Sequence, residues 1–380
     1  MTRIVSIATQ QVPIPLPAPV VPQGGTLTFR RLDNLVVHVG TDDGGQGSAY
    51  VWLPGSGAGP GDPPVPAQRA VEELVHGLGA ALIGADVFSH EQLWKAMATR
   101  VEHHGRGLLS LAHSGLDMAM WDAALKSVGL PLHRALGSPT QGTGCYSNQL
   151  LDYWDADLAE LAAAAKRIVA DGFTCLKMPA GMHPREADDW DLHRVAAVRE
   201  AIGPEIGLMV DVGCRWRADQ VAMLAPRLHE FALRWLEDPL PLSQPEGLRQ
   251  LRSRIGTPIA TGENSFDLGQ LHDLVRRGAV DVVIYEPMRV GGITGSVKLA
   301  HMAELYGVPI APHTYPDLAA QLMPAAATGA LCEYLEWWRP LLTNPVDPDH
   351  GRMAPTTGPG IGLDMRPEFL ESFATRVTRG

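Results

Sequence analysis

Three acidic residues follow one another along the chain at a constant spacing, each at the end of a short apolar run. Asp211 closes GLMVD, Glu237 closes RWLE and Glu263 closes IATGE, each acid 26 positions after the one before. This spacing is about the length of one strand-plus-helix unit, so the carboxylates should meet at the same end of neighbouring parallel strands. A single acid could equally cap a helix or pair with a surface base, but three matched positions favour a Mg²⁺ site, because oxygen ligands suit that ion and crowded carboxylates need a cation.

Further ionisable residues continue the series at later strand ends. Glu286 ends DVVIYE, His313 ends VPIAPH and Glu336 ends EYLE, whereas Lys177 lies within CLKMP, before the three metal acids. A histidine beside a carboxylate at a barrel mouth is a candidate general base. Glu286 would orient the imidazole of His313 and raise its pKa, while a nearby Mg²⁺ would lower that pKa.

The elements that must position these residues are short apolar runs alternating with amphipathic stretches. Eight candidate strands span residues 144–149, 175–179, 207–212, 234–237, 258–263, 281–286, 308–313 and 334–337. Strand–helix alternation repeated in this way predicts an α/β fold with a closed (β/α)₈ TIM-type barrel. A doubly wound open sheet remains the alternative architecture.

The N-terminal region differs from this pattern and predicts a small α+β capping domain over residues 1–125. Strands are expected at residues 4–9, 35–40 and 47–52, followed by three helices. The tail, about 345–380, is expected to complete this domain, which leaves 126–344 as the barrel. Two Pro- and Gly-rich segments, 12–25 and 54–64, are candidate lids over a site or plain surface loops.

Composition narrows the class of protein. The 31 Lys+Arg and 42 Asp+Glu residues give a formal net charge of −11, which argues against nucleic acid or an anionic membrane as the main partner. Prolines between residues 13 and 22 interrupt any apolar signal region, and no run of 18 apolar residues occurs. The four cysteines form no CxxC pair, which is typical of free thiols in a reducing compartment. We therefore expect a cytoplasmic protein.

Several segments taken together resemble the enolase superfamily, specifically its mandelate racemase-like branch. The stretch GLDMAMWDAALKSVGLPLHRALG, residues 115–137, resembles the helix that leads into the barrel in that superfamily. The segments GFTCLKMP, LMVDVG, WLEDP, ATGEN and EPMRVGGITG resemble successive barrel strands in the same order. The resemblance covers essentially the whole chain.

The resemblance implies a chemistry in which a base removes the proton α to a substrate carboxylate. It implies that Asp211, Glu237 and Glu263 bind Mg²⁺, and that the reaction passes through an enediolate intermediate. An α-proton of a carboxylate is very weakly acidic, so such an enediolate needs strong electrostatic stabilisation. The implied partners are a small hydroxy-carboxylate substrate and further copies of the chain, in a dimer or an octamer.

Three departures from the branch shape the prediction. The second Lys of the usual Lys-x-Lys pair is absent, because the segment reads Lys177-Met178-Pro179, which resembles rhamnonate dehydratases. The histidine's partner is Glu286 where Asp is usual. Gly213 stands where the branch often carries Asn after the first metal acid, so an amide that could contact substrate is lost.

We therefore expect a Mg²⁺-dependent hydro-lyase that dehydrates an aldonate or aldarate to a 2-keto-3-deoxy acid. His313 would serve as the single acid–base group and Lys177 would hold the substrate carboxylate. Glu336, if protonated, would hydrogen-bond a carboxylate oxygen, and Arg289 would contact a distal hydroxyl or carboxylate, unless it merely faces solvent. The alternatives are an epimerase, lactonising enzyme or cycloisomerase on a related hydroxy acid, and a non-catalytic metal-binding barrel.

Overall fold

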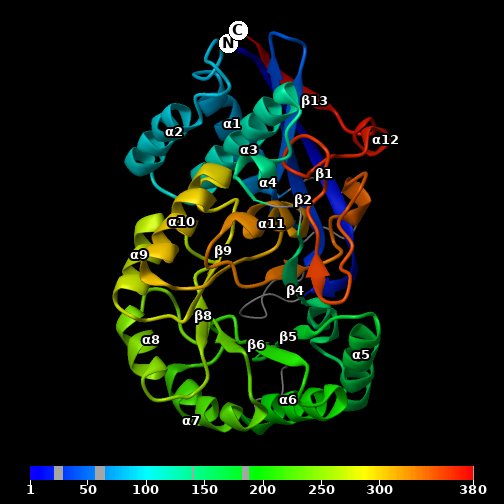
Figure 1. The fold of residues 1–380 in the computed structure, drawn as a ribbon, viewed down its shortest axis with the longest axis vertical. Helices are drawn as coiled ribbons and strands as arrows, with labels where there is room; N and C mark the ends of the chain where they lie inside the picture. Colours follow the sequence, from blue (N-terminus) through cyan, green and yellow to red (C-terminus); the bar gives the residue numbers. More distant parts are fainter. Residues whose placement is uncertain (21–28, 56–64, 139–140, 182–187, 380) are drawn as a thin grey trace.

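A four-stranded antiparallel sheet and a parallel barrel form the two parts of the molecule (Figure 1). The computed structural model describes residues 1–20, 29–55, 65–138, 141–181 and 188–379. The antiparallel sheet has the order β13-β1-β2-β3, with bounds β1 (Ile4–Val20), β2 (Phe29–Thr41), β3 (Gln46–Gly55) and β13 (Thr375–Arg379). Strands from both ends of the chain therefore share one sheet.

Strand β1 is longer than the predicted 4–9, and it includes most of the proline-rich stretch. Strand β13 pairs with β1 only over Ser6–Gln10, so beyond Gln10 no described strand pairs with that side of β1. Prolines at alternate positions 13, 15, 17 and 19 can be accommodated there, because an edge strand needs donors on one side only. The first candidate lid, 12–25, is thus strand as far as Val20, and its remainder lies outside the described residues.

Two helices, α1 (Pro66–Gly79) and α3 (Leu108–Val128), pack on this sheet, and α2 (His90–His104) packs against α3. Helix α3 is apolar all round and almost wholly buried, which suits a helix enclosed between a sheet and a second domain. Gly47 of β3 lets the two elements approach closely, since a Cβ there would lie 2.1 Å from the backbone nitrogen of Ala123. In the second candidate lid, 54–64, only residues 54 and 55 are described, and they end β3.

Eight parallel strands in the order β10-β9-β8-β7-β6-β5-β4-β11 form the barrel. A bridge between Ile310 and Gly329 brings the two ends of this order together. The predicted (β/α)₈ architecture is confirmed. The strand bounds are β4 (Thr143–Ser147), β5 (Cys175–Pro179), β6 (Gly207–Asp211), β7 (Trp235–Glu237), β8 (Ile259–Thr261), β9 (Val282–Tyr285), β10 (Ile310–Pro312) and β11 (Cys332–Tyr334).

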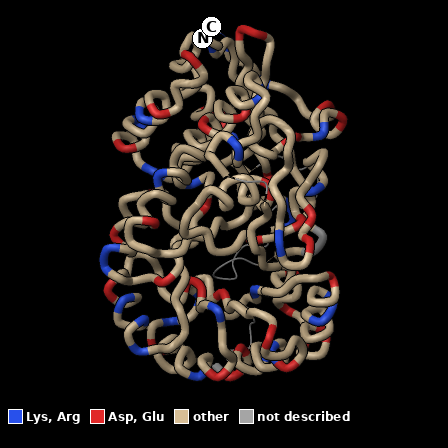
Figure 2. Tube along the Cα trace, in the orientation of Figure 1, with Lys and Arg blue, Asp and Glu red and all other residues tan. Residues whose placement is uncertain are grey.

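Helices between the strands cover the outside of the barrel, where Lys, Arg, Asp and Glu are interspersed (Figure 2). Their bounds are α5 (Leu158–Ala170), α6 (Asp188–Ile202), α7 (Ala218–Leu228), α8 (Pro245–Arg252), α9 (Leu268–Arg276), α10 (Gly292–Tyr306) and α11 (Pro316–Leu322). Short elements complete the chain: α4 (Leu132–Ala135), β12 (Arg352–Met353), α12 (Pro367–Leu370) and the 3₁₀ turns η1 (Gln149–Tyr153), η2 (His229–Phe231), η3 (Met323–Ala325) and η4 (Arg339–Leu341).

Alternation along the strands places an apolar floor below the acidic residues. Met209 pairs with Trp235, and two residues later Asp211 pairs with Glu237. Because successive side chains point to opposite faces of a strand, Met209 and Trp235 share the barrel interior with the two acids above them. The floor is a buried cluster that also includes Tyr146.

Among the described helices, none combines the length and the apolar character that a bilayer crossing requires.

Candidate metal and acid–base site

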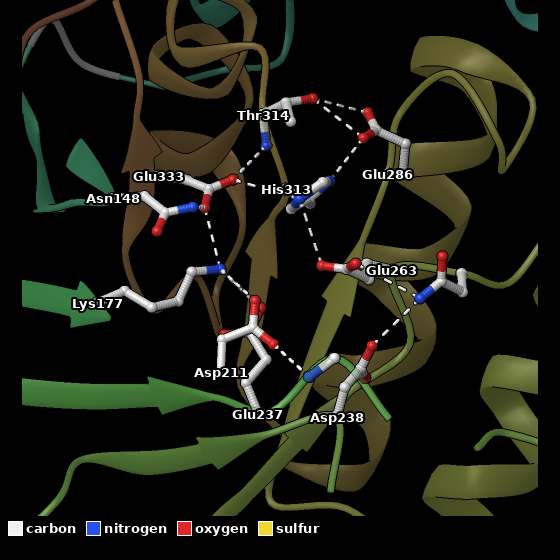
Figure 3. Close-up of polar contacts among 12 residues, drawn as sticks. Asn148, Lys177, Asp211, Glu237, Asp238, Glu263, Glu286, His313, Thr314 and Glu333 are labelled. Atoms are coloured by element: carbon white, nitrogen blue, oxygen red, sulfur yellow. Dashed lines mark hydrogen bonds and ion pairs between the residues drawn. The ribbon is translucent and has the colours of Figure 1, made fainter. Parts of the chain in front are cut away.

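The three predicted metal acids meet at the carboxyl ends of neighbouring strands (Figure 3). Asp211, Glu237 and Glu263 each contribute one carboxylate oxygen to a group whose oxygens all lie within 4.8 Å of one another. Two of the carboxylates are fixed by hydrogen bonds from nearby nitrogens. The backbone N–H of Gly213 donates to Asp211 Oδ1 at 2.8 Å, and the indole N–H of Trp235 donates to Glu237 Oε2 at 2.8 Å.

The donor set fits a hard divalent cation. Oε2 of Glu263 is buried and has no hydrogen-bond partner among the described residues. Burial, with the charges of Asp211 and Glu263 adding to it, raises the pKa of Glu237 to about 8, and burial also raises the pKa of Asp211. Carboxylates held in this way favour a positive ion between them, and three oxygen ligands leave room for the waters or substrate oxygens that Mg²⁺ retains.

Lys177 lies beside the metal acids from β5 and is fully buried. Its Nζ is 2.7 Å from Glu237 Oε1, 3.0 Å from Glu333 Oε1 and 3.8 Å from Asp211 Oδ2. It also lies 5.4 Å from the centre of the Tyr146 ring. Burial disfavours the ammonium, but the carboxylates of Glu237 and Glu333 outweigh burial and hold the pKa of Lys177 above its usual range. Lys177 is therefore a fixed cation next to the metal acids.

His313 and Glu286 form a hydrogen-bonded pair at the next strands. Nδ1 of His313 lies 2.7 Å from Glu286 Oε2, and because a carboxylate accepts, Nδ1 carries the proton. Nε2 then lies 3.3 Å from Glu263 Oε2, facing the metal acids. Burial lowers the pKa of His313, but the charges of Glu263, Glu333 and Glu286 outweigh it and raise that pKa to about 10. A cation bound at the acids opposes this rise.

The backbone after His313 is held in an uncommon conformation. Thr314 and Tyr315 both have positive φ, 55° and 50°. The Thr314 hydroxyl donates to Glu286 at 3.0 Å, and the Tyr315 hydroxyl donates to the backbone oxygen of Tyr50 in β3 at 2.8 Å. Left-handed residues of this kind persist where surrounding contacts over-determine them. These contacts couple the position of His313 to its partner carboxylate and to the capping domain.

Glu336 does not join the cluster, and Glu333 takes the place that was predicted for it. Strand β11 ends at Tyr334, so Glu336 lies beyond the strand and is exposed, 3.4 Å from the Tyr334 hydroxyl. Glu333 is fully buried; it accepts from Asn148 Nδ2 at 2.7 Å and from the Thr314 backbone N–H at 2.6 Å. The predicted strand, 334–337, was placed too late because one apolar run contains two glutamates three residues apart.

The pKa of Glu333 is lowered by its surroundings. Burial alone raises its pKa, but Lys177, His313 and the Thr314 N–H outweigh burial and lower the pKa of Glu333 to about 2. Glu333 is therefore an ionised acceptor that fixes Lys177 and Thr314. It cannot donate the hydrogen bond to substrate that a protonated glutamic acid would supply.

Asp238 and Asn148 are two further polar residues that the sequence did not single out. Asp238 follows Glu237 with φ of 44° and is buried, accepting from Thr261 Oγ1 at 2.5 Å and Asn264 Nδ2 at 3.2 Å. Burial and the charges of Glu263 and Asp211 raise the pKa of Asp238 to about 7. The acidic pair in WLEDP was the one signal available for it, and nothing in the sequence marked Asn148.

Arg289 lies at the rim of the cluster, and its guanidinium is bonded to other residues of the chain. Its Nη1 donates to the backbone oxygen of Glu263 at 2.7 Å and to Asn264 Oδ1 at 2.8 Å. Its guanidinium also lies over the Phe266 ring, 5.3 Å from the ring centre. These contacts hold the loop that carries Glu263.

The arrangement brings together what proton abstraction beside a carboxylate requires. Asp211, Glu237 and Glu263 can hold a cation, and Lys177 adds a fixed positive charge. A cation at the acids would oppose the rise in the pKa of His313 and so let its Nε2 atom accept a proton. The Pro179 side chain at the end of β5 offers no second base. The geometry thus supports one acid–base group beside an electrophilic centre.

Comparison with known proteins gives matches over both parts of the chain. Residues 5–137 match the family described as mandelate racemase/muconate lactonizing enzyme, N-terminal domain, and residues 160–369 match the family described as enolase C-terminal domain-like.

Two curated relatives illustrate the range of activities. An L-talarate/galactarate dehydratase of Salmonella typhimurium is 30% identical over 285 residues, covering 75% of this chain and 71% of the relative. A D-galactarolactone cycloisomerase of Agrobacterium fabrum is 28% identical over 375 residues, covering 92% and 94%.

Solved structures agree over the full length. A mandelate racemase/muconate lactonizing enzyme from Polaromonas sp. JS666 superposes with a TM-score of 0.88 at 27% identity, covering 100% of this chain and 99% of the other. An L-talarate dehydratase from the same organism, complexed with Mg and L-glucarate, superposes with a TM-score of 0.86 at 27% identity, covering 100% of both chains.

Proposed function

The chain belongs to the mandelate racemase/muconate lactonizing enzyme family of the enolase superfamily, and on that basis we propose that it is a Mg²⁺-dependent acid-sugar dehydratase. The substrate is an aldonate or aldarate, and the product is a 2-keto-3-deoxy acid. The observation that carries this proposal is the His313–Glu286 pair, whose second nitrogen, Nε2, lies 3.3 Å from the metal acid Glu263, while the segment Lys177-Met178-Pro179 lacks a second Lys. A single group that both accepts and returns a proton suits elimination better than racemisation, which needs a base on each face.

Asp211, Glu237 and Glu263 would hold the Mg²⁺. When bound, the ion supplies positive charge that stabilises the negative charge developing on the substrate carboxylate. Lys177 adds a second positive charge from β5, and Glu333 keeps its ammonium in place through a 3.0 Å contact. These residues bind and polarise the carboxylate end of the substrate.

His313 carries the proton transfers. Its Nε2 takes the proton from C2, while Glu286, accepting from Nδ1, stabilises the imidazolium that forms. The same Nε2–H then donates to the hydroxyl on C3, so that the C3–O bond breaks, water leaves and a C2–C3 double bond forms. The resulting enol tautomerises to the 2-keto acid. One imidazole thus begins and ends the cycle in its neutral form.

The test is a screen of aldonic and aldaric acids with Mg²⁺, scored by 2-keto acid formation, with EDTA and the His313→Asn variant as matched controls. The proposal expects a substrate whose dehydration requires both Mg²⁺ and His313. Turnover that persists in His313→Asn would contradict the single-base mechanism. Silence across a broad library would contradict dehydration itself.

A second candidate function is isomerisation, as an epimerase, lactonising enzyme or cycloisomerase on a related hydroxy acid. It is favoured by the match to the Agrobacterium cycloisomerase, which extends over more of both chains than the match to the Salmonella dehydratase. Incubation in D₂O separates the two, because reversible exchange at C2 without a 2-keto product indicates isomerisation. A non-catalytic metal-binding barrel predicts no exchange at all; the assembled His313–Glu286 pair argues against it.

For the domain organisation, the location and the oligomeric state, we propose what the sequence indicates. The capping domain, 1–125 completed by about 345–380, would cover the mouth of the barrel, 126–344, and select substrate. We also propose a cytoplasmic location, supported by four free cysteines, and a homo-oligomer. Light scattering on the purified protein measures the oligomeric state directly.

A further inference from the structure

We propose that Arg215 binds a second carboxylate at the far end of the substrate, so that the site prefers aldaric acids, which carry two carboxylates, over aldonic acids. The inference rests on the proposed function, which leaves the two classes open. It assigns a role to a residue that the sequence did not single out and that lies outside the metal and acid–base groups.

Arg215 is placed at the mouth of the barrel by the turn after β6. Its Nη1 donates to the backbone oxygens of Ala180 and Val212, each at 3.2 Å. Ala180 directly follows β5 and Val212 directly follows Asp211, the last residue of β6. The guanidinium therefore lies at the carboxyl ends of the same two strands that carry Lys177 and the first metal acid.

Among the described residues, the guanidinium has no acidic partner of the kind that such a group usually has. Within the described part of the chain, no carboxylate lies within ion-pairing distance of Arg215, whereas Arg217, two residues later, pairs with Asp219 at 2.9 Å. The Nε atom of Arg215 is buried and has no hydrogen-bond partner among the described residues. Burial lowers the pKa of Arg215, and Asp211 and Glu263 oppose that change. A half-buried cation in this state favours an anionic ligand.

The guanidinium nitrogens of Arg215 that make no hydrogen bond to described residues are arranged to bind a carboxylate. With Nη1 bonded to two carbonyls, Nε and Nη2 remain, and these two N–H groups lie on one edge of the guanidinium. That edge is the one that binds a carboxylate through two parallel hydrogen bonds. A hydroxymethyl group, which ends an aldonic acid, cannot satisfy it with the same charge or geometry.

Gly213 makes the placement possible. It has φ of 54°, and a Cβ at this position would lie 2.8 Å from Arg215 Nη1 and 3.0 Å from Cζ. The guanidinium therefore occupies the space that a side chain at 213 would fill. Where the branch often carries the amide of an Asn at position 213, this chain has Gly213 and places the positive charge of Arg215 in the same space.

Electrostatics give the same preference. The first carboxylate of the substrate is matched by Lys177 and by the cation at the metal acids. A second carboxylate at this mouth would otherwise face Asp211 and Glu263 and be repelled. Arg215 is the charge that offsets this repulsion. Removing Arg215 should therefore weaken the binding of diacids, which carry the second carboxylate, more than that of monoacids.

The experiment pairs two substrates that differ only at the far end, galactarate and galactonate, with the wild type, Arg215→Met and Arg215→Lys. Wild type is expected to prefer galactarate by at least ~10-fold in kcat/KM. Arg215→Met should lower the galactarate value ~30-fold or more, chiefly through KM, and change galactonate less than about 3-fold. Arg215→Lys should keep part of the preference. Arg217→Met, an exposed neighbour, serves as the matched charge control and should leave the preference intact.

Binding of each acid to the Mg²⁺-loaded protein, measured by calorimetry, separates this inference from the proposed function. One outcome is that neither acid is dehydrated, while the wild type still binds galactarate more tightly than galactonate and Arg215→Met does not. That result would contradict the proposed dehydration but support the role of Arg215. If dehydration occurs and the galactarate preference is equal in wild type and Arg215→Met, the role of Arg215 is overturned. A wild type that prefers galactonate, or binds neither acid, also overturns it.

Gly213→Asn provides a test that leaves Arg215 in the chain. Asparagine tolerates a left-handed backbone, so the variant should fold. Its Cβ must displace the guanidinium, and the galactarate preference should therefore fall toward that of Arg215→Met. A folded Gly213→Asn variant with an undiminished preference would contradict the inference.

Discussion

Nδ1 of His313 lies 2.7 Å from Oε2 of Glu286, although 27 residues separate the two along the chain. The contact depends on the pairing of β9 with β10, since the backbone N–H of His313 donates to the Tyr285 oxygen at 2.7 Å. The base and the group that orients it are thus aligned by main-chain hydrogen bonds of the barrel wall. Glutamate in place of the expected aspartate still reaches the ring.

The first prediction concerns the base itself. His313→Asn should lower kcat at least ~10³-fold and abolish exchange of the C2 proton in D₂O, because no described group near Nε2 can replace it. Mg²⁺ binding by calorimetry should change little, since the three metal acids remain. Exchange at the wild-type rate would show that another group removes the proton.

The second prediction concerns its partner. Glu286→Gln should lower kcat ~10²-fold or more, because a neutral amide lacks the negative charge with which the carboxylate stabilises the imidazolium. KM should change less than kcat, since Glu286 is fully buried behind His313. Rescue by Glu286→Asp would measure how much the extra methylene matters. An unchanged kcat in Glu286→Gln would remove Glu286 from the mechanism.

The third prediction compares two glutamates three residues apart. Glu333→Gln should lower kcat/KM by ~10–100-fold and destabilise the fold, because it removes a buried charge that contacts Lys177 and the Thr314 N–H. Glu336→Gln should leave both quantities within about twofold, since Glu336 is exposed. Steady-state kinetics and thermal melts check both. Equal effects of the two substitutions would contradict the placement of β11.

The fourth prediction concerns the metal. Mg²⁺ should raise the melting temperature of the wild type, by an amount equivalent to about 2.7 kcal/mol at 100 times Kd, and EDTA should reverse it. Glu237→Gln should lose this stabilisation, because one of three ligands becomes neutral. Glu246→Gln, an exposed acid paired with Arg249, is the control that should keep it. A Mg²⁺ response that survives in Glu237→Gln would place the ion elsewhere.

The fifth prediction concerns acid sensitivity of the capping domain. Burial lowers the pKa of His38 from 6.5 to about 4, and its ring nitrogens contact Ser48 at 2.7 Å and Gln10 at 2.9 Å. A histidine held neutral contributes stability that is present above pH 6.5 and is lost as the pH falls toward 4, by up to about 1.4 kcal/mol per unit.

Denaturant titrations between pH 7.5 and 4.5 test this directly. His38→Gln should flatten the loss of unfolding free energy over that range, even if the variant is less stable at pH 7.5. His350→Gln, at a residue whose side chain is 91% exposed, should leave the slope unchanged. A slope that is identical in His38→Gln and wild type would show that His38 does not titrate on unfolding.

Part of the site could be predicted from the sequence, and part could not. Asp211, Glu237 and Glu263 were predicted to meet because each ends an apolar run, and the repeat of a strand and a helix fixes where such ends lie. Glu333 was missed because a single strand has no internal marker of where pairing stops. Its position depends on the register of Cys332 with Cys145, which only the assembled barrel defines.

Other features depend on contacts between distant segments. The proline-rich segment near the start of the chain was expected to be a loop, yet it is strand because β2 supplies partners as far as Pro15 and again at Val20. Asp238 lies in a left-handed turn whose geometry no spacing pattern encodes. Arg215 was not singled out because its importance arises from the space beside Gly213.

The pairing of β13 with β1 has a consequence for how the protein is made. The two strands that flank β1 are far apart in the sequence. Strand β2 follows β1 directly, whereas β13 comes after every barrel strand. During synthesis on the ribosome, one edge of β1 therefore stays unpaired until the barrel has emerged. An unpaired strand edge can pair with the wrong strand in that interval. The sheet that we propose to cap the site is completed last, so folding intermediates with a complete barrel should already bind metal before that sheet is complete.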